Sequence, residues 1–343
     1  STFIAMQDSG LRMPPGETVS VPEVAVAPAE PQPTKIVPPP KPKSDGPAII
    51  KVQPEPAAPG GTIVIRDPSA LERNPRTAHL PVREMIEDSP VGPLPVRAAD
   101  GRRPFDVYSG AWSGSRGAKV ALVVGGLGLS QTGTQAAINA LPPEVTLGFA
   151  SAGNSLSRWM QAARQKGHEI VMQVPMEPFD FPAVDPGRNP LTVEAGAEEN
   201  IDHLHWALSR TTNYTGIMNH MGGRFVADRE AMAPVMQELG KRGLMYLDDG
   251  TSARSVASEL ALGSAVPFAA ADAIIDGVRE RGDILKKLDQ LEAAARAKGS
   301  AIGIGSAFDL TVGAVVSWVA EAKKRGIEIV PVSALASDPE AGR

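Results

Sequence analysis

The sequence predicts an α/β domain of seven or eight strand–helix units that closes into a barrel or near-barrel. Apolar, strand-like runs alternate with helix-like stretches from about residue 119 to residue 335. This alternation is typical of a parallel sheet whose strands are connected by helices. Four of the predicted helices also end in a cation and a glycine, because the cation suits the negative helix end and the glycine supplies a left-handed cap. These joints are Lys166-Gly167, Arg242-Gly243, Lys298-Gly299 and Arg325-Gly326.

The predicted elements follow one another at regular spacing. The first strand, residues 119–124, is continuously apolar and ends at Gly125-Gly126, as expected of a strand buried on both faces. Further strands are predicted at residues 145–149, 168–174, 215–218, 244–247, 273–275, 300–305 and 327–330. Helices are predicted at residues 130–140, 155–166, 197–210, 228–242, 252–262, 279–298 and 312–325. In such folds a functional site lies at the carboxyl ends of the strands.

The chain before this domain has a different character. Residues 1–60 hold fourteen of the 32 prolines and lack apolar periodicity, so we expect a disordered or extended linker. It is either a spacer that holds the domain away from a membrane or partner, or a tail without a role. Residues 61–117 are rich in turns and are expected to form an irregular extension that packs on the barrel or on a partner, with a short strand at residues 62–65. Its expected apolar anchors are Leu80, Met85, Ile86, Leu94, Phe105 and Val107. Residues 118–336 would form the barrel domain and residues 337–343 a tail.

Composition excludes several classes of function. The absence of cysteine excludes disulfide frameworks, thiol nucleophiles and cysteine-based zinc sites, and it is compatible with an oxidising compartment. A net charge of −5 argues against a nucleic-acid partner. No stretch reaches the roughly 18 apolar residues that a membrane span needs. The chain begins at Ser1, which suggests that a signal peptide or a membrane anchor has been removed from the N-terminus.

Polar side chains follow three of the predicted strands. Glu177, fixed between two prolines, is either a general base or ligand, or the cap of a loop. His220 follows Asn219 and precedes Arg224 around a glycine pair, and it suits proton transfer or metal binding unless it is a structural histidine. Asp248 and Asp249 can together hold a cation or act as acid and base.

Each carboxylate also has a simpler explanation. Asp249 or Thr251 would cap the helix predicted from residue 252, and Asp309 would cap the helix near residue 311. The glycines at residues 125, 126 and 128 complete neither phosphate-loop pattern. A tight turn therefore explains them better, and a nucleotide-dependent enzyme is the weakest hypothesis.

These strand ends, taken in order, resemble the divergent polysaccharide deacetylase family, a branch of the NodB-homology carbohydrate esterases, over about residues 118–336. The segments that carry the resemblance include Val174-Pro175-Met176-Glu177-Pro178, Asn219-His220-Met221-Gly222, Arg224-Phe225, Leu247-Asp248 and Val330-Pro331-Val332-Ser333. The resemblance implies a distorted (β/α) barrel and metal-assisted deacetylation of an N-acetylated glycan, such as peptidoglycan. It also implies a periplasmic or otherwise extracytoplasmic location in the cell envelope, with or without a membrane anchor.

Three positions depart from the family pattern. Family members typically end the first strand with a paired Asp, where this chain has Gly125 and Gly126. Gln173 stands where the pattern has a His, and Ser306 stands where the pattern has the His of Gly-His-Pro-Tyr. The candidate catalytic residues that remain are Glu177, His220, Asp248 and Asp249, and the candidate substrate-binding residues are Asn219 and Arg224.

Two hypotheses follow from these departures. In the first, the chain is a degenerate deacetylase, a pseudoenzyme of carbohydrate metabolism with weak or absent activity that binds an envelope glycan or protein and needs no cofactor. In the second, it is an active metal-dependent deacetylase that holds zinc in a rearranged site. A zinc site commonly needs three protein ligands. Loss of a general base alone costs about 10²–10⁴ in rate, which favours the first hypothesis.

Overall fold

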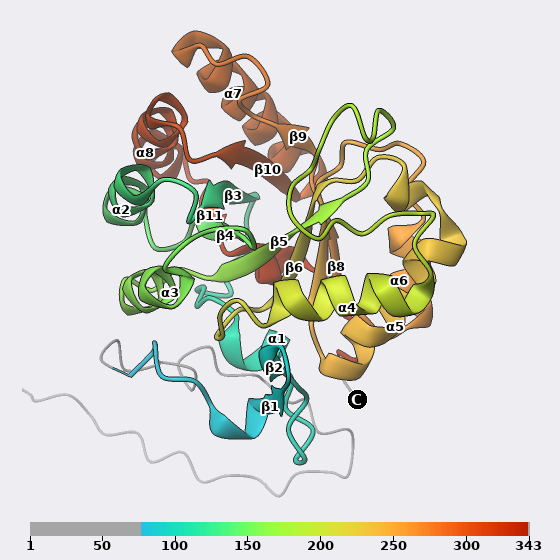
Figure 1. The fold of residues 1–343 in the computed structure, drawn as a ribbon. Helices are drawn as coiled ribbons and strands as arrows, with labels where there is room; N and C mark the ends of the chain where they lie inside the picture. The colour runs from blue at the N-terminus through green and yellow to red at the C-terminus, as the bar shows by residue number, and fades with distance from the viewer. Residues whose placement is uncertain (1–76, 342–343) are drawn as a thin grey trace, which may run out of the picture. The chain divides into compact units, whose positions relative to one another are not determined.

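The computed structural model describes residues 77–341, which belong to one compact unit of the chain, Thr62–Arg343. Its centre is a curled sheet with the strand order β8-β7-β6-β5-β4-β3-β10-β9, and β11 pairs with β3 (Figure 1). All of these pairings are parallel. The strands are β3 (Lys119–Leu127), β4 (Thr146–Ala150), β5 (Ile170–Met176), β6 (Gly216–Met221), β7 (Met245–Asp248), β8 (Phe268–Ala270), β9 (Ala273–Ile274), β10 (Ser300–Ser306) and β11 (Glu328–Val330).

The longest strand, β3, holds the sheet together. Its first residues pair with β11 and its later residues with β4, so these two strands share one edge of β3 while β10 takes the other edge. Within residues 77–341 no pairing joins β8 to β9, so the curled sheet remains open between them. The structure thus confirms the predicted distorted barrel.

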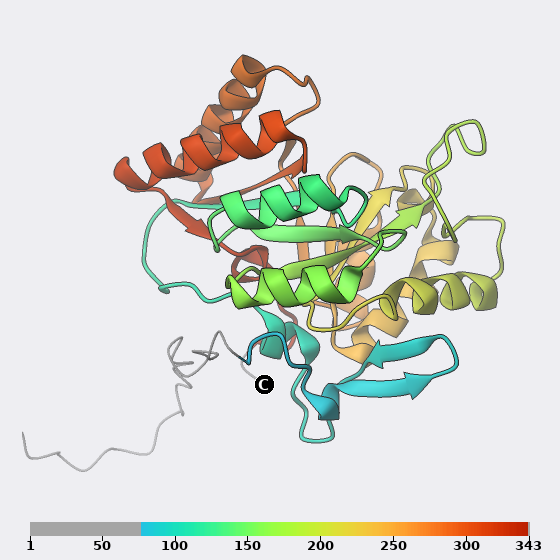
Figure 2. The ribbon, with the colours of Figure 1, turned by 60° about the vertical axis from the view of Figure 1, so that its left-hand side comes forward.

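Helices cover the outer surface of the curl (Figures 1 and 2). They are α2 (Gln131–Ala140), α3 (Leu156–Gln165), α4 (Ala197–Leu208), α5 (Arg229–Arg242), α6 (Ala257–Gly263), α7 (Arg281–Lys298) and α8 (Asp309–Lys324). The side chains of Ser130 and Asp228 cap α2 and α5, because each accepts a hydrogen bond from a backbone N–H of the first turn. The four glycines after a cation have φ values between 70° and 95°, which confirms the predicted left-handed caps. In the described part of the chain, no helix is both long and apolar enough to cross a bilayer.

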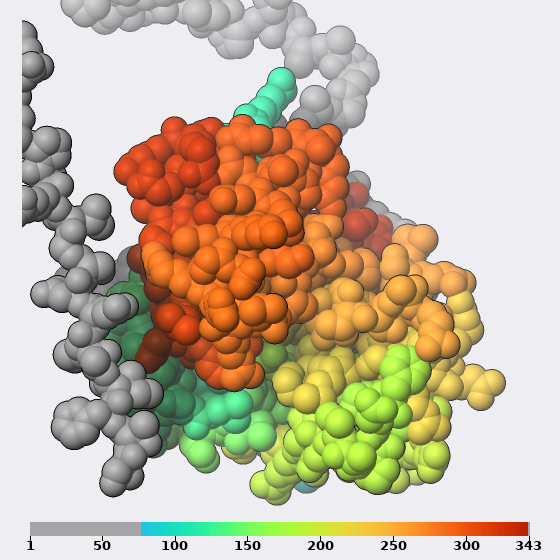
Figure 3. All heavy atoms as spheres, turned by 90° about the horizontal axis from the view of Figure 1, so that it is seen from above, coloured from blue at the N-terminus to red at the C-terminus, as the bar shows by residue number. Residues whose placement is uncertain are grey.

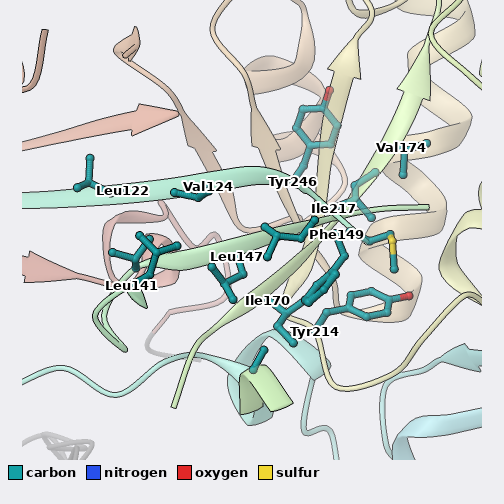
Figure 4. Close-up of a cluster of buried hydrophobic side chains, with 14 of the residues drawn as sticks. Leu122, Val124, Leu141, Leu147, Phe149, Ile170, Val174, Tyr214, Ile217 and Tyr246 are labelled. Carbon is teal, nitrogen blue, oxygen red and sulfur yellow. The ribbon is translucent and has the colours of Figure 1, made fainter. Parts of the chain in front are cut away.

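Two apolar layers lie on the two faces of the sheet. The outer layer contains alternate strand residues such as Leu122, Leu147 and Ile217 together with helix residues (Figure 4). The inner layer contains the intervening strand residues, such as Val123, Val171 and Met218, and no residue of the helices α2 to α8. Because successive side chains of a strand point to opposite faces, the second layer fills the inside of the curl.

The residues before β3 form regular structure and pack on the barrel. They comprise a 3₁₀ turn, η2 (Arg83–Met85), a hairpin of β1 (Ile86–Ser89) and β2 (Gly92–Pro95), and a short helix, α1 (Pro104–Tyr108). The hairpin lies beside α4 (Figure 2). Phe105 belongs to the inner layer, and its backbone N–H donates to the carbonyl of Gly243, two residues before β7. Met85, Leu94 and Phe105 are buried.

Buried ion pairs connect this extension to the end of the chain. The guanidinium of Arg103 donates to Asp106 at 2.7 Å and to Asp338 at 2.7 Å, and its side chain is only 3% exposed. Ser337 forms a backbone bridge with Phe268 of β8. Part of the expected tail, up to Glu340, is therefore docked on the domain.

Several expectations fail locally. Leu80 is 54% exposed, so it is not an anchor, while Ile86 and Val107 are only half-buried. The helix expected from residue 252 begins at Ala257, and α8 begins at Asp309 itself, so Asp249, Thr251 and Asp309 are not the caps that were expected. The short strand β8 was not expected, because three residues are too few to show a period. The linker at residues 1–60 and the strand at residues 62–65 lie outside the described residues.

Candidate functional site

Because successive side chains of a strand face opposite sides of the sheet, six residues at the strand ends face the mouth of the barrel. On β7, Met245 and Leu247 belong to the inner layer, so Asp249 continues that face beyond the end of the strand. On β6, His220 lies two residues after the inner-layer residue Met218 and therefore faces the same side. By the same alternation, the inner faces of β3, β5, β9 and β10 end at Gly125, Gln173, Asp276 and Ser306. All six positions line one pocket, here called the strand-end pocket.

The strand-end pocket has a volume of about 170 Å³. Its apolar floor is made by Met218, Ile274 and Ile304. Its polar lining consists of two carboxylates, one imidazole, two carboxamides and a hydroxyl, and it includes no lysine or arginine. These polar residues are Gln173, Asn219, His220, Asp249, Asp276 and Ser306.

Gln173 occupies the space that two glycines leave open. Its Oε1 accepts a hydrogen bond from the backbone N–H of Gly126 at 2.6 Å. A Cβ atom on residue 125 would lie 2.8 Å from Gln173 Nε2, closer than real Cβ atoms approach another heavy atom. Gly126 itself has φ +79°, a conformation that favours glycine. The glycine pair and Gln173 therefore fit each other, and a side chain on residue 125 would require the Gln173 amide to move.

The two carboxylates of the pocket differ in how many hydrogen bonds they accept from the described residues. Asp249 Oδ1 accepts hydrogen bonds from the Thr251 backbone N–H and hydroxyl, at 2.9 and 2.7 Å, and the Asn219 side chain also hydrogen-bonds the Asp249 carboxylate. Asp276 Oδ2 accepts from the Ser306 backbone N–H at 2.7 Å and from the Thr311 hydroxyl at 3.0 Å, but Oδ1 accepts none. Each residue is buried by nine-tenths or more. Asp276 Oδ1 therefore remains available to a ligand.

Burial shifts the titration of two pocket residues in opposite directions. Desolvation by burial raises the pKa of Asp249 above its usual value, and the nearby Asp248 carboxylate adds to this rise. Partial loss of hydration lowers the pKa of His220, although the residue is exposed at the pocket mouth, and the Asp249 carboxylate opposes this shift. The lowered pKa favours the neutral imidazole, which can donate and accept a hydrogen bond.

Glu177 and Arg224, two of the predicted site residues, lie outside the strand-end pocket. The Glu177 carboxylate is buried and accepts hydrogen bonds from the Arg224 guanidinium and from the Val193 backbone N–H. The Glu177 carbonyl also accepts the backbone N–H groups of Arg224 and Phe225. This pair joins the segment after β5 to the segment after β6, and in this structure it is engaged in holding those segments.

The remaining predicted residues divide between the pocket and its support. Asp248 points to the helix side of β7 and accepts hydrogen bonds from the Ser255 hydroxyl and the Gly250 backbone N–H. Asn219 lines the pocket and bridges two backbones, since its Oδ1 accepts from the Asp249 N–H at 2.9 Å and its Nδ2 donates to the Met221 carbonyl at 2.7 Å. The structure thus brings Asn219, His220 and Asp249 together.

Sequence reasoning missed Asp276 as a site residue. It follows the two-residue strand β9, which is too short to display alternation by itself. Its place directly after the apolar residues 273–275 was the available signal. Gln173 and Ser306 were identified as replaced family positions, and both line the pocket.

The residues at these strand ends do not fit a catalytic zinc ion. Zinc needs three protein ligands at about 2.0–2.2 Å for nitrogen and oxygen donors. Within residues 77–341, no group of three or more His, Asp or Glu side chains is placed to hold a metal. Glycines and a carboxamide stand where the family pattern places ligands, and a carboxamide already bonded to a backbone N–H is a poor replacement for imidazole.

Large apolar side chains are exposed on the segments that follow the strands. They belong to the last residue of β6, to the loops after β3, β5, β9 and β10, and to the first turn of α8, and their exposed fractions run from 36% to 62%. An arginine guanidinium packs over two of these aromatic rings. The Cζ of Arg279 lies 4.2 Å from the ring centre of Phe308, and the Cζ of Arg254 lies 5.1 Å from that of Phe179. Figure 3 shows α7, in orange, and the lime segment between β5 and α4 on the same face, with yellow and gold residues between them. The exposed apolar residues at these strand ends are Leu129, Phe179, Val184, Met221, Val278, Phe308 and Leu310.

Comparison with known proteins agrees with this architecture. The crystal structure of an uncharacterized protein from Agrobacterium tumefaciens C58 is 55% identical, covers 71% of this chain and 99% of its own, and superposes with a TM-score of 0.70. An uncharacterized protein of Haemophilus influenzae is 29% identical over 54% of this chain, and the uncharacterized protein YibQ of Escherichia coli is 28% identical over 52%. The chain spans 66% and 55% of these two relatives, less than two thirds of each.

The family comparison covers the whole barrel. The family model described as divergent polysaccharide deacetylase matches residues 122–336, from the middle of β3 to the end of the domain. The match includes every strand that contributes to the strand-end pocket. The chain therefore belongs to the divergent polysaccharide deacetylase family.

Proposed function

We propose that this chain is a degenerate deacetylase that binds a glycan of the cell envelope without hydrolysing it. The observation that carries the proposal is the fit between Gln173 and the pair Gly125–Gly126. This fit fills the ligand positions of the family with groups that bind no zinc, yet it leaves a polar pocket open at the mouth of the barrel. A retained pocket without metal ligands is what a binding module needs.

The chemistry of the pocket suits a sugar. Carboxylate, carboxamide, imidazole and hydroxyl groups converge on it, and they can accept and donate hydrogen bonds to sugar hydroxyl and amino groups. The exposed rings of Phe179 and Phe308 offer apolar surface for further rings of a chain. A glycan would therefore place one terminal sugar in the pocket, and its next sugars would contact the surrounding loops.

Binding assays test this proposal directly. Isothermal titration with soluble peptidoglycan fragments and with chitooligosaccharides should give saturable binding, which His220→Ala and Gln173→Ala should weaken. The control is Glu321→Gln, on an exposed site of α8 that is remote from the pocket, which should leave binding unchanged. If no glycan binds, and the protein does not associate with intact peptidoglycan sacculi, the proposal is wrong.

A hydrolase with a rearranged site is the second candidate. It is favoured by one observation, that the neutral imidazole of His220 and the Asp249 carboxylate share the pocket. Such a pair can accept a proton from water, but the oxyanion that forms would have no cation beside it, since no lysine or arginine lines the pocket.

Acetate release distinguishes the two candidates. The wild-type protein should release no acetate from N-acetylated glycans, with or without added zinc, and elemental analysis should find no stoichiometric metal. Acetate release that His220→Ala abolishes would establish the hydrolase instead.

A further inference from the structure

The strand-end pocket presents negative charge that the described residues leave uncompensated. Asp249 and Asp276 both line this cavity and are 9% and 7% exposed, and Asp276 Oδ1 accepts no hydrogen bond from the described residues. No lysine or arginine is among the lining residues. A buried carboxylate without a cation is costly, so its ligand is expected to bring a positive charge or several strong donors.

Among the described residues, His220, Asp249 and Asp276 are not grouped closely enough to hold a metal ion, so a polyatomic cation fits the pocket better. An ammonium group carries three N–H donors, which can reach both carboxylates and leave one donor for a further acceptor. The pocket volume of about 170 Å³ equals that of about five or six water molecules, so it accepts one small polar unit.

Other polar atoms of the pocket indicate which groups of the ligand lie next to its ammonium. Gln173 Nε2 donates no hydrogen bond to the described residues, and the ring of His220 makes none either. These groups need oxygen acceptors close to the cation. A 2-amino sugar has hydroxyl oxygens on the carbons next to its ammonium, whereas a lysine side chain has only an apolar stem there.

We propose that the strand-end pocket binds the free ammonium group of a de-N-acetylated amino sugar at the end of a glycan chain. Asp249 and Asp276 hold the ammonium, while Gln173 and His220 contact the neighbouring hydroxyl groups. This inference rests on the proposed glycan-binding function and adds the form of the sugar. The chain would then recognise the product of deacetylation rather than its substrate.

Two oligosaccharides that differ only in their acetyl groups test the inference. Glucosamine tetramers and N-acetylglucosamine tetramers are titrated into the purified chain at neutral pH, and the glucosamine tetramer should bind at least about tenfold more tightly, the effect of one charge-assisted hydrogen bond. Asp249→Asn and Asp276→Asn should each remove most of this preference. Circular dichroism and the unfolding temperature establish that both variants fold.

The net charge of −5 attracts any cationic oligomer, so a charge-matched control is needed. Glu321→Gln removes one negative charge from an exposed position of α8 and should keep the full preference. An equal loss in Glu321→Gln would show non-specific attraction and overturn the inference.

The remaining outcomes separate this inference from the proposed function. Equal or tighter binding of the N-acetylated tetramer would overturn the inference and leave glycan binding intact. Binding of neither tetramer nor of peptidoglycan fragments would overturn both. Tighter binding of a lysine-containing peptide than of the glucosamine tetramer would overturn it in favour of a protein ligand.

Discussion

Gln173 Oε1 accepts the backbone N–H of Gly126 at 2.6 Å, and this bond couples the ends of β5 and β3. The amide stands where a side chain on residue 125 would have to be. The residues at positions 125 and 173 are thus expected to be coupled, because each limits the space that the other can occupy.

Gly125→Ala should destabilise the protein by about 1–3 kcal/mol, because its Cβ overpacks against Gln173. Gln173→Ser removes the obstructing amide, so the double variant should lose much less than the sum of the two single variants. Urea unfolding of the four proteins measures this coupling as a double-mutant cycle.

Gly282→Ala is the matched control for this cycle. Residue 282 lies in the first turn of α7, and a Cβ there would meet no atom within 4 Å. The control should be as stable as the wild type or more stable by up to about 1 kcal/mol. Purely additive effects of Gly125→Ala and Gln173→Ser would contradict the proposed coupling.

The order of strands and helices could be predicted from sequence because long apolar runs, caps and cation–glycine joints are local signals. The site could be predicted only in part. Strand ends identify which residues reach the mouth, but alternation decides which of them point inward. Asp248 follows Tyr246 toward the helices, whereas Asp249 follows Leu247 toward the barrel interior.

The rest of the site depends on contacts that are distant in sequence. Glu177 lies four residues after Gln173, so strand alternation alone would place it on the inner face. The turn after β5 instead brings it to Arg224, which follows the end of β6, 45 residues after the end of β5. Asp276 follows a strand too short to show its own period. The role of the glycines at residues 125 and 126 becomes visible only when the amide of Gln173 is placed beside them.

Asp249→Asn should stabilise the protein at neutral pH. Burial raises the pKa of Asp249 above its usual value of 3.8, so its contribution to stability is present below that value and is lost as the pH rises through the raised pKa. At neutral pH the charged carboxylate therefore costs stability, which asparagine avoids while its Oδ1 still accepts from Thr251. The advantage of the variant should shrink as the pH falls, measured by unfolding at neutral pH and at the lowest pH where both proteins fold.

The exposed carboxylate of Glu321 gives the contrast to Asp249. The Lys324 ammonium lowers the pKa of Glu321, so removing this charge in Glu321→Gln should not stabilise the protein. A variant at residue 249 that gains stability but loses ligand affinity would mark a carboxylate kept for binding. Loss of stability in Asp249→Asn at neutral pH would indicate that the charge serves the fold.

Phe105→Ala should destabilise the domain by about 3–5 kcal/mol, although Phe105 precedes the barrel in sequence. Phe105 is 7% exposed and belongs to the same buried cluster as the inner-face residues of the strands. Leu80→Ala, at a position that is 54% exposed in the same extension, should change stability by less than about 0.5 kcal/mol. Similar small effects of both substitutions on denaturant unfolding would mean that the extension does not contribute to the core.

Arg103 should be the charged residue of the extension on which the domain most depends. Its buried guanidinium pairs with Asp106 and Asp338, so Arg103→Ala leaves carboxylates without their partner and should cost about 3–5 kcal/mol. Asp338→Asn keeps an acceptor for the guanidinium and should cost less. Asp88→Asn breaks the solvent-exposed pair with Arg83 and should leave stability nearly unchanged. Denaturant unfolding ranks the three variants, and limited proteolysis near residues 336–341 should be faster in Arg103→Ala because the end of the chain loses its anchor. Equal stability of all three variants would show that water replaces the buried pairs without cost.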